Sequence, residues 1–188
     1  RVPLSERPAG RSDKGTRYDR TSVGAFARSD PDLPAPDMQF GIGPGLSPDH
    51  PETGYSIMVI PLRPTSRGRL TLKSDNPWDH PILDPEHLST EKDLDDFATC
   101  LRWGRKMGEA DALADIRDVE VCPGPEAQSD EELVEYARNN AVSGYHPVGT
   151  AKMGTDDLAV VDNELRVHGL NNLRVMDASI MPQITSGN

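Results

Sequence analysis

The sequence is poor in aromatic residues, which make up 5% of its 188 residues, and it contains only two cysteines. So few cysteines exclude a disulfide-stabilised scaffold and favour a reducing compartment, which we expect to be the cytoplasm. No run of 18 apolar residues occurs, so we expect no transmembrane segment. No secretory signal is visible, although the chain begins with Arg1 rather than Met.

Positive charge is also scarce. Lys and Arg total 20 against 31 Asp and Glu, which gives a formal net charge of −11. Binding to phosphate groups needs cationic side chains, so nucleic acid and anionic membrane surfaces are poor partners for this chain. The length suffices for one domain with a core, and the 16 Gly and 17 Pro predict many turns and irregular segments.

The first part of the chain is predicted to contain loops and one pair of strands. Residues 1–20 are polar and form a tail, and the proline-rich residues 30–54 form an extended connection. Residues 55–62 are rich in β-branched side chains, and residues 67–73 alternate polar and apolar, so both are expected to be strands. The few residues between them supply a turn, which predicts antiparallel pairing of these two strands.

Two amphipathic helices are expected, at about 91–108 and 129–140. Each follows a hydroxyl residue that has an acidic residue three positions later, a pattern typical of a capping box. These pairs are Thr90 with Asp93 and Ser129 with Glu132. Short apolar runs at 158–161 and 173–176 favour further strands. An antiparallel β-sheet backed by α-helices, an α+β fold, is therefore predicted.

The most informative pattern lies in the last 44 residues. His146 precedes Pro147, which favours an extended conformation at the histidine, and Gly149 and Gly154 permit close approach of the backbone. A histidine held in such a loop is a candidate general acid or base, because its ordinary pKa is close to neutrality. From the residues alone, a surface or capping histidine is the alternative.

Two weaker patterns are better explained by turns. Residues 41–45, Gly-Ile-Gly-Pro-Gly, lack the sixth-position glycine and the following helix of a dinucleotide-binding loop, so we expect a loop. Asp79, His80, Asp84 and His87 include His-Pro and Asp-Pro pairs that favour turns, and no metal site is predicted.

Several stretches resemble the C-terminal part of the glucose–methanol–choline (GMC) family of flavin-dependent alcohol oxidoreductases. The terminal block runs from Tyr145-His146-Pro147-Val148-Gly149-Thr150 through Leu173-Arg174-Val175-Met176-Asp177-Ala178-Ser179 to Ser186-Gly187-Asn188. Upstream, Pro64-Thr65-Ser66-Arg67-Gly68 and Asp84-Pro85 are similar to the same family. The resemblance covers roughly residues 22–188.

This resemblance implies the oxidation of a primary alcohol to an aldehyde, as in choline dehydrogenase-like members, with FAD as cofactor. His146 matches the family's catalytic histidine, which assists removal of the hydroxyl proton. Asn188 matches the second active-site position, which is Asn or His in the family. Asp177 and Ala178 match the segment that runs beside the flavin. The implied substrate is a small-molecule alcohol.

The resemblance also implies a division of the chain. Residues 21–154 correspond to the substrate-binding domain, and residues 155–188 to the C-terminal segment of the FAD-binding domain. The Gly-rich loop of the FAD-binding N-terminal half is not in this sequence, and the family normally continues beyond Asn188. We therefore expect a part of a larger enzyme. The alternatives are a non-catalytic remnant or binding fragment that cannot hold FAD alone, and one half of a split flavoenzyme.

Overall fold

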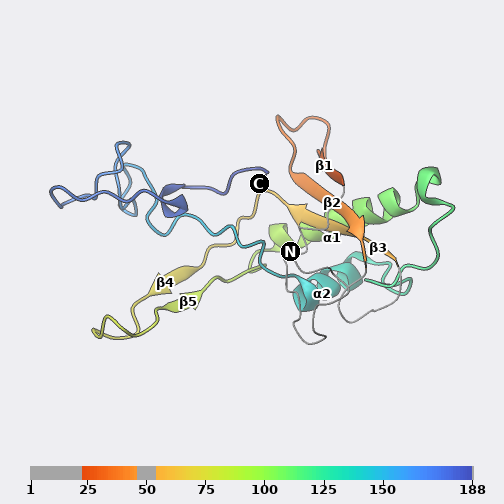
Figure 1. The fold of residues 1–188 in the computed structure, drawn as a ribbon, viewed down its shortest axis with the longest axis horizontal. Coiled ribbons are helices and arrows are strands. Elements are labelled where there is room, and N and C mark those ends of the chain that lie inside the picture. Colours follow the sequence, from red (N-terminus) through yellow and green to blue (C-terminus); the bar gives the residue numbers. More distant parts are fainter. Residues whose placement is uncertain (1–22, 46–53, 188) are drawn as a thin grey trace, which may run out of the picture.

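The computed structural model describes residues 23–45 and 54–187. Its main body is a three-stranded antiparallel sheet with one helix along one face and a second helix beside the first (Figure 1). A two-stranded hairpin and the C-terminal segment extend away from this body as separate arms (Figure 1). Antiparallel sheets combined with helices confirm the predicted α+β fold. The polar tail predicted at residues 1–20 lies outside the described residues.

The sheet comprises β1 (Val23–Ala27), β2 (Met38–Pro44) and β3 (Tyr55–Pro61), in that spatial order. The prediction of a continuous loop over residues 30–54 is wrong at β2, which includes the glycine-rich residues that resembled a dinucleotide-binding loop. Glycine and proline disfavour strands, but β2 pairs along its whole length with β3 and buries hydrophobic side chains. Tertiary packing therefore overrides the local preference.

The main core lies between the sheet and α1 (Glu91–Gly108), and its buried members are Met38, Phe40 and Cys100. Met38 and Phe40 are 2% and 1% exposed, and burial of each stabilises the fold by roughly 1.5–3 kcal/mol. Partly buried side chains from both strands and helix surround them: Ala25, Ala27, Ile57, Val59, Trp103 and Met107.

Helix α1 follows its predicted limits. The Thr90 hydroxyl accepts a hydrogen bond from the Asp93 N–H at 3.3 Å and caps the N-terminus. Gly104 allows the helix to approach β3 closely, because a Cβ at this position would lie 3.0 Å from a methyl group of Val59. A larger residue at position 104 would push the helix away from the sheet.

Helix α2 (Asp130–Asn140) packs against α1 rather than directly against the sheet. The predicted capping box is confirmed: the Ser129 hydroxyl accepts from the Glu132 N–H at 3.2 Å, and the Glu132 carboxylate accepts from the Ser129 N–H at 2.8 Å. Leu133 and Ala137 are buried on the face toward the rest of the domain.

The first arm is the hairpin of β4 (Arg69–Thr71) and β5 (Ile82–Asp84), with Leu70 directly opposite Leu83. The predicted pairing of residues 55–62 with 67–73 is wrong, because β3 pairs with β2 and β4 pairs with β5. The segment between β3 and β4 does not form a tight turn. It is held instead by the start of α1.

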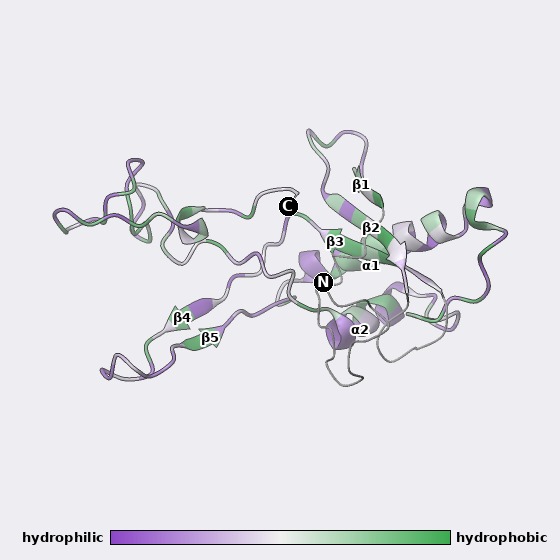
Figure 2. Cartoon of the chain, in the orientation of Figure 1, coloured by the Kyte–Doolittle hydropathy of each residue, from purple (hydrophilic) through white to green (hydrophobic). Residues whose placement is uncertain are grey.

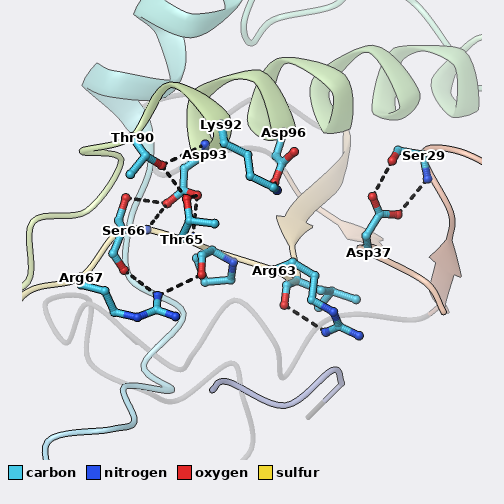
Figure 3. A network of polar contacts seen from close by, with 12 residues as sticks. Ser29, Asp37, Arg63, Thr65, Ser66, Arg67, Thr90, Lys92, Asp93 and Asp96 are labelled. Carbon is cyan, nitrogen blue, oxygen red and sulfur yellow. Dashed lines mark hydrogen bonds and ion pairs between the residues drawn. The ribbon is translucent and has the colours of Figure 1, made fainter. Parts of the chain in front are cut away.

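A buried carboxylate holds this segment. Asp93 is 4% exposed, and its oxygens accept hydrogen bonds from the N–H groups of Thr65 and Ser66 at 2.7 and 2.9 Å and from both hydroxyl groups. Figure 3 shows these residues converging at the first turn of α1. Burial opposes the charge, but the hydrogen bonds from Ser66 and Thr65 outweigh it and hold the pKa of Asp93 far below its ordinary value.

The C-terminal arm, residues 141–187, contains little regular structure. The strands predicted at 158–161 and 173–176 are wrong, because only isolated β-bridges form there, such as Val161 with Val167 and Arg166 with Arg174. Val161 is fully buried where these bridges meet. The arm contains the short 3-10 helix η4 (Ala178–Ile180), whereas the 3-10 helix η3 (Asp111–Leu113) lies between α1 and α2. Apolar runs this short fill the centre of a folded loop without forming a continuous ladder.

Both arms carry apolar side chains on their surface. Figure 2 shows hydrophobic residues on the hairpin strands and along the C-terminal segment as well as in the main sheet. Leu72, Trp78 and Met176 are 81%, 89% and 85% exposed. Among the described residues, no helix has the length and apolar character that a membrane crossing requires.

Candidate active site

His146 lies near the start of the C-terminal arm, soon after α2 ends at Asn140. The preceding Tyr145 adopts a left-handed conformation with φ of 62°, and its N–H donates to the Ser143 hydroxyl at 3.1 Å. A bulky residue at positive φ costs of order 1–3 kcal/mol, and such conformations cluster at functional sites. Pro147 follows the histidine. The backbone direction is therefore restricted on both sides of His146.

The His146 side chain is exposed. Within the described part of the chain it forms no hydrogen bond or ion pair. The imidazole is thus open to a molecule that approaches from outside this chain. The second histidine of the C-terminal arm differs, because His168 Nε2 lies 3.1 Å from the Gly154 carbonyl oxygen.

The residues that follow His146 are bonded to η4. The Ala151 N–H donates to the Ser179 carbonyl at 3.0 Å, and the Met153 N–H donates to the Ile180 carbonyl at 2.8 Å. Gly149 has φ of +90°, a conformation that side-chain-bearing residues rarely adopt, and it lies beside Met181: a Cβ there would contact the Met181 carbonyl oxygen at 3.5 Å. Tertiary structure therefore joins the histidine segment to the segment that begins with Asp177 and Ala178.

Asp177 begins η4. Its carboxylate accepts a hydrogen bond from the Ser179 N–H at 2.7 Å, and the hydrogen bonds from Ser179 lower the pKa of Asp177. Asp177 and Ala178 are both exposed. The assignment of these two residues to cofactor binding remains a prediction.

Asn188, the second predicted catalytic residue, lies outside the described residues. The chain leading to it returns to the main body: Arg63 Nη1 donates to the Ser186 hydroxyl, and Gly187 lies against the ring of Phe26. Gly187 has φ of +83°, and a Cβ there would be 3.4 Å from that ring. The C-terminal arm therefore spans from η4 back to the edge of the sheet.

Two aspartates of the C-terminal arm are paired with basic side chains. Lys152 donates to Asp156 at 2.8 Å and lowers the pKa of Asp156, and Arg166 donates to Asp162 and lowers the pKa of Asp162 to about 2. Because a lowered pKa means a weaker base, neither carboxylate is suited to take up a proton at neutral pH. His146 is the better candidate for a general base.

No group of three or more His, Cys, Asp or Glu is arranged to bind a metal ion in residues 23–45 and 54–187. Asp79 accepts from Ser74 and Asn76 at the tip of the hairpin. Asp84 lies 3.4 Å from Arg69. These residues form the turn and the strand pair of the hairpin.

Sequence reasoning missed two polar residues. It treated Asp93 only as a capping residue, whereas this carboxylate fixes the base of the hairpin. It also offered no candidate in residues 30–54, where Gln39 lies on β2 with a side-chain oxygen that is buried and has no hydrogen-bond partner among the described residues. A lone polar residue between Met38 and Phe40 is consistent with strand alternation, which is the signal that was available.

Comparisons with known proteins cover most of this chain. Residues 64–188 match the family model described as GMC oxidoreductase. Human choline dehydrogenase, named as mitochondrial, is 46% identical over 173 residues, which cover 88% of this chain and 29% of that protein. Among solved structures, pyridoxine 4-oxidase from Mesorbium loti superposes with a TM-score of 0.80 and 33% identity, over 89% of this chain and 34% of that one.

An FAD-dependent oxidoreductase from Chaetomium thermophilum is also similar, with a TM-score of 0.72 and 28% identity over 81% of this chain and 25% of that chain. The chain thus spans only about a third or less of the length of the relatives it matches. The family model covers about two thirds of the chain, including the His146 segment and η4. The chain belongs to the GMC oxidoreductase family.

Proposed function

We propose that this chain is the substrate-facing, C-terminal part of an FAD-dependent enzyme that oxidises a primary alcohol to an aldehyde. One observation carries the proposal: the segment that follows His146 is hydrogen-bonded to η4, next to Asp177 and Ala178. This arrangement joins a candidate general base to an exposed segment that can lie beside a flavin. The choline dehydrogenase and pyridoxine 4-oxidase similarities support the same reaction type.

In this proposal the chain's residues manage the proton and the position of the alcohol. When bound, FAD accepts the hydride from the carbon that bears the hydroxyl group. A neutral His146 imidazole accepts the hydroxyl proton, a step worth on the order of 10²- to 10⁴-fold in rate. The Asn188 side-chain amide donates a hydrogen bond to the alkoxide oxygen as its charge develops.

This chain spans only about a third of the length of these relatives, which supports the proposal that it holds only part of the cofactor site. The exposed apolar arms support the same reading, since monomeric proteins rarely leave contiguous apolar surface uncovered. We propose that a flavin-binding N-terminal half covers them. The division at residues 154 and 155 stays a prediction, as does cytoplasmic location. The human relative's name places that protein in the mitochondrion.

The proposal is tested first by FAD binding, measured by flavin absorbance after gel filtration of this chain with and without a flavin-binding N-terminal half. We expect stoichiometric FAD only in the combined protein. A chain that binds no FAD in either state would support the non-catalytic alternative. If FAD binds only when this chain is combined with a flavin-binding half that occurs naturally as a separate polypeptide, the protein is one half of a split enzyme.

In the combined, FAD-loaded enzyme, His146→Ala should lower kcat for alcohol oxidation by about 10²- to 10⁴-fold. His80→Ala is the matched control, because His80 is also an exposed histidine before a proline but lies in the hairpin. The control should retain full turnover. If both variants turn over like the parent enzyme, His146 has no part in the reaction.

A further inference from the structure

The side-chain oxygen of Gln39, a partly buried residue, is a buried polar atom that the proposed mechanism leaves unexplained. This oxygen is inaccessible to solvent and has no hydrogen-bond partner in the described part of the chain. An amide buried without a partner costs roughly 1–3 kcal/mol, and most such groups in folded proteins are satisfied. A polar side chain that is present despite this energetic cost is expected to serve a function.

Strand register shows on which face of the sheet Gln39 lies. Its neighbours Met38 and Phe40 belong to the core between the sheet and α1. Side chains alternate along a strand, so Gln39 points to the opposite face. Its direct cross-strand partners are Phe26 on β1 and Ile60 on β3. This opposite face is covered by neither α1 nor α2 (Figure 1).

The chain that leads to the proposed active site reaches the same face. Gly187 lies against Phe26, which is directly opposite Gln39 in the sheet. Phe26 is 51% exposed. Two residues further along the strands, Gly24 and Gly41 form the next pair on this face, and neither has a side chain. The side chains directly beside Gln39 on this face, those of Phe26 and Ile60, are therefore apolar.

We infer that Gln39 is a specificity-determining residue, which hydrogen-bonds a second hydroxyl group of the alcohol substrate. The inference rests on the proposed function and names the substrate class for the same site. The terminal torsion of a glutamine is broad, so the amide can turn either its oxygen or its nitrogen outward. A hydroxyl group both donates and accepts, and so bonds the amide in either orientation.

The energetic consequence is a preference for diols. A site whose polar group bonds a substrate hydroxyl discriminates against the analogue that lacks it, because the protein group is then left unpaired. The apolar neighbours Phe26 and Ile60 cannot supply that bond. Replacing Gln39 by leucine, which has a similar volume, removes the polar requirement and keeps the surface filled.

The test uses the full-length, FAD-loaded enzyme with 1,4-butanediol and 1-pentanol, which differ by a hydroxyl against a methyl group. We expect the ratio of kcat/KM for the diol to that for 1-pentanol to fall about tenfold or more in Gln39→Leu. Met58→Leu is the matched control, since Met58 pairs with Gly41 on the same face of the sheet and is apolar. The control should leave the ratio unchanged. An equal effect of Gln39→Leu on both alcohols would overturn the inference.

Thermal unfolding supplies a second measurement that does not depend on turnover. If the Gln39 amide is unpaired until substrate binds, Gln39→Leu should unfold at the same temperature as the parent or higher. A clear drop in the melting temperature would mean that the amide is bonded in the folded enzyme, and would overturn the inference. Absence of flavin reduction by any alcohol would instead refute the proposed function.

Discussion

Asp93 shows how one buried carboxylate can organise a large part of a chain. Its four accepted hydrogen bonds join the first turn of α1 to Thr65 and Ser66. This contact sets where the hairpin leaves the main body (Figure 3). The helix cap alone would need only the Thr90 hydroxyl. The carboxylate therefore acts between elements rather than within one.

Asp93→Ala should lower the free energy of unfolding by about 2–4 kcal/mol, because two backbone N–H groups lose their acceptor in a buried place. Asp95→Ala is the control, since Asp95 is exposed on the same helix, and its effect should stay within about 0.5 kcal/mol. Chemical denaturation measures both. Equal, small effects would show that Thr65 and Ser66 find other acceptors.

The same residue predicts a pH dependence. The pKa of Asp93 is lowered in the folded chain, whereas the pKa of an aspartate in the unfolded chain is about 3.9. Its stabilisation is therefore fully present above that pH and is lost as the pH falls toward the folded-state value. The stability difference between the parent and Asp93→Asn should shrink as pH is lowered from about 5 to 3. A difference that stays constant over this range would contradict the lowered pKa.

The two cysteines should differ in reactivity. Burial, with a smaller effect from the negative charges of Asp96 and Asp37, raises the pKa of the Cys100 thiol to about 12. Cys122 is exposed. At about pH 8 a thiol reagent should label one cysteine quickly in the folded chain and two after denaturation, because the thiolate is the reactive form. Rapid labelling of both in the folded chain would show that the core around Cys100 opens.

At the scale of elements, the hairpin depends on a residue without a side chain. A Cβ at Gly68 would lie 2.2 Å from the Asp84 carbonyl oxygen and 2.5 Å from Pro85 backbone atoms. Backbone atoms cannot move aside as the end of a side chain can. Gly68→Ala should therefore separate β4 from β5 or displace the segment that Asp93 holds.

We expect Gly68→Ala to increase amide hydrogen exchange at Leu70 and Leu83, which are opposite each other in the hairpin. Gly24→Ala is the matched control, because a Cβ there would meet only the Phe40 carbonyl oxygen, at 3.8 Å. The control should leave exchange in the hairpin unchanged. Unchanged exchange in Gly68→Ala as well would mean that the strands tolerate the methyl group.

At the scale of the whole molecule, hydrophobic surface is distributed unevenly. The sheet and helices enclose a core, while the hairpin and the C-terminal arm expose large apolar side chains (Figure 2). A two-stranded hairpin is marginally stable in water without further packing. The arms are therefore the part of this chain that gains most from a covering domain.

The fluorescence of Trp78 can show whether another domain covers the hairpin. It is 89% exposed, whereas Trp103 is half-buried against the core. In this chain, acrylamide should quench Trp78 strongly, and Trp78→Phe should remove most of the quenchable fluorescence. Adding the proposed flavin-binding half should protect Trp78 if that half covers the hairpin. Unchanged quenching in the combined protein would place the hairpin tip outside that interface.

Local sequence determined the helices and the segment around His146. The limits of α1 and α2 follow from capping residues and from hydrophobic spacing within one stretch of chain, so both were predictable. The consecutive patterns of the terminal block that begins at Tyr145, together with those upstream from Pro64, likewise indicate the family, and the family model matches residues 64–188. These features need no knowledge of distant contacts.

Only the tertiary structure decided which strands pair and what the polar residues contact. Strand pairing depends on partners far along the chain, so β3 joins β2 and β4 joins β5 even though residues 55–62 and 67–73 are neighbours in sequence. The bonds between the His146 segment and η4 likewise arise from long-range contacts, as does the burial of the Gln39 side-chain oxygen without a partner among the described residues. Local propensity carries no information about such contacts, because burial and register set them.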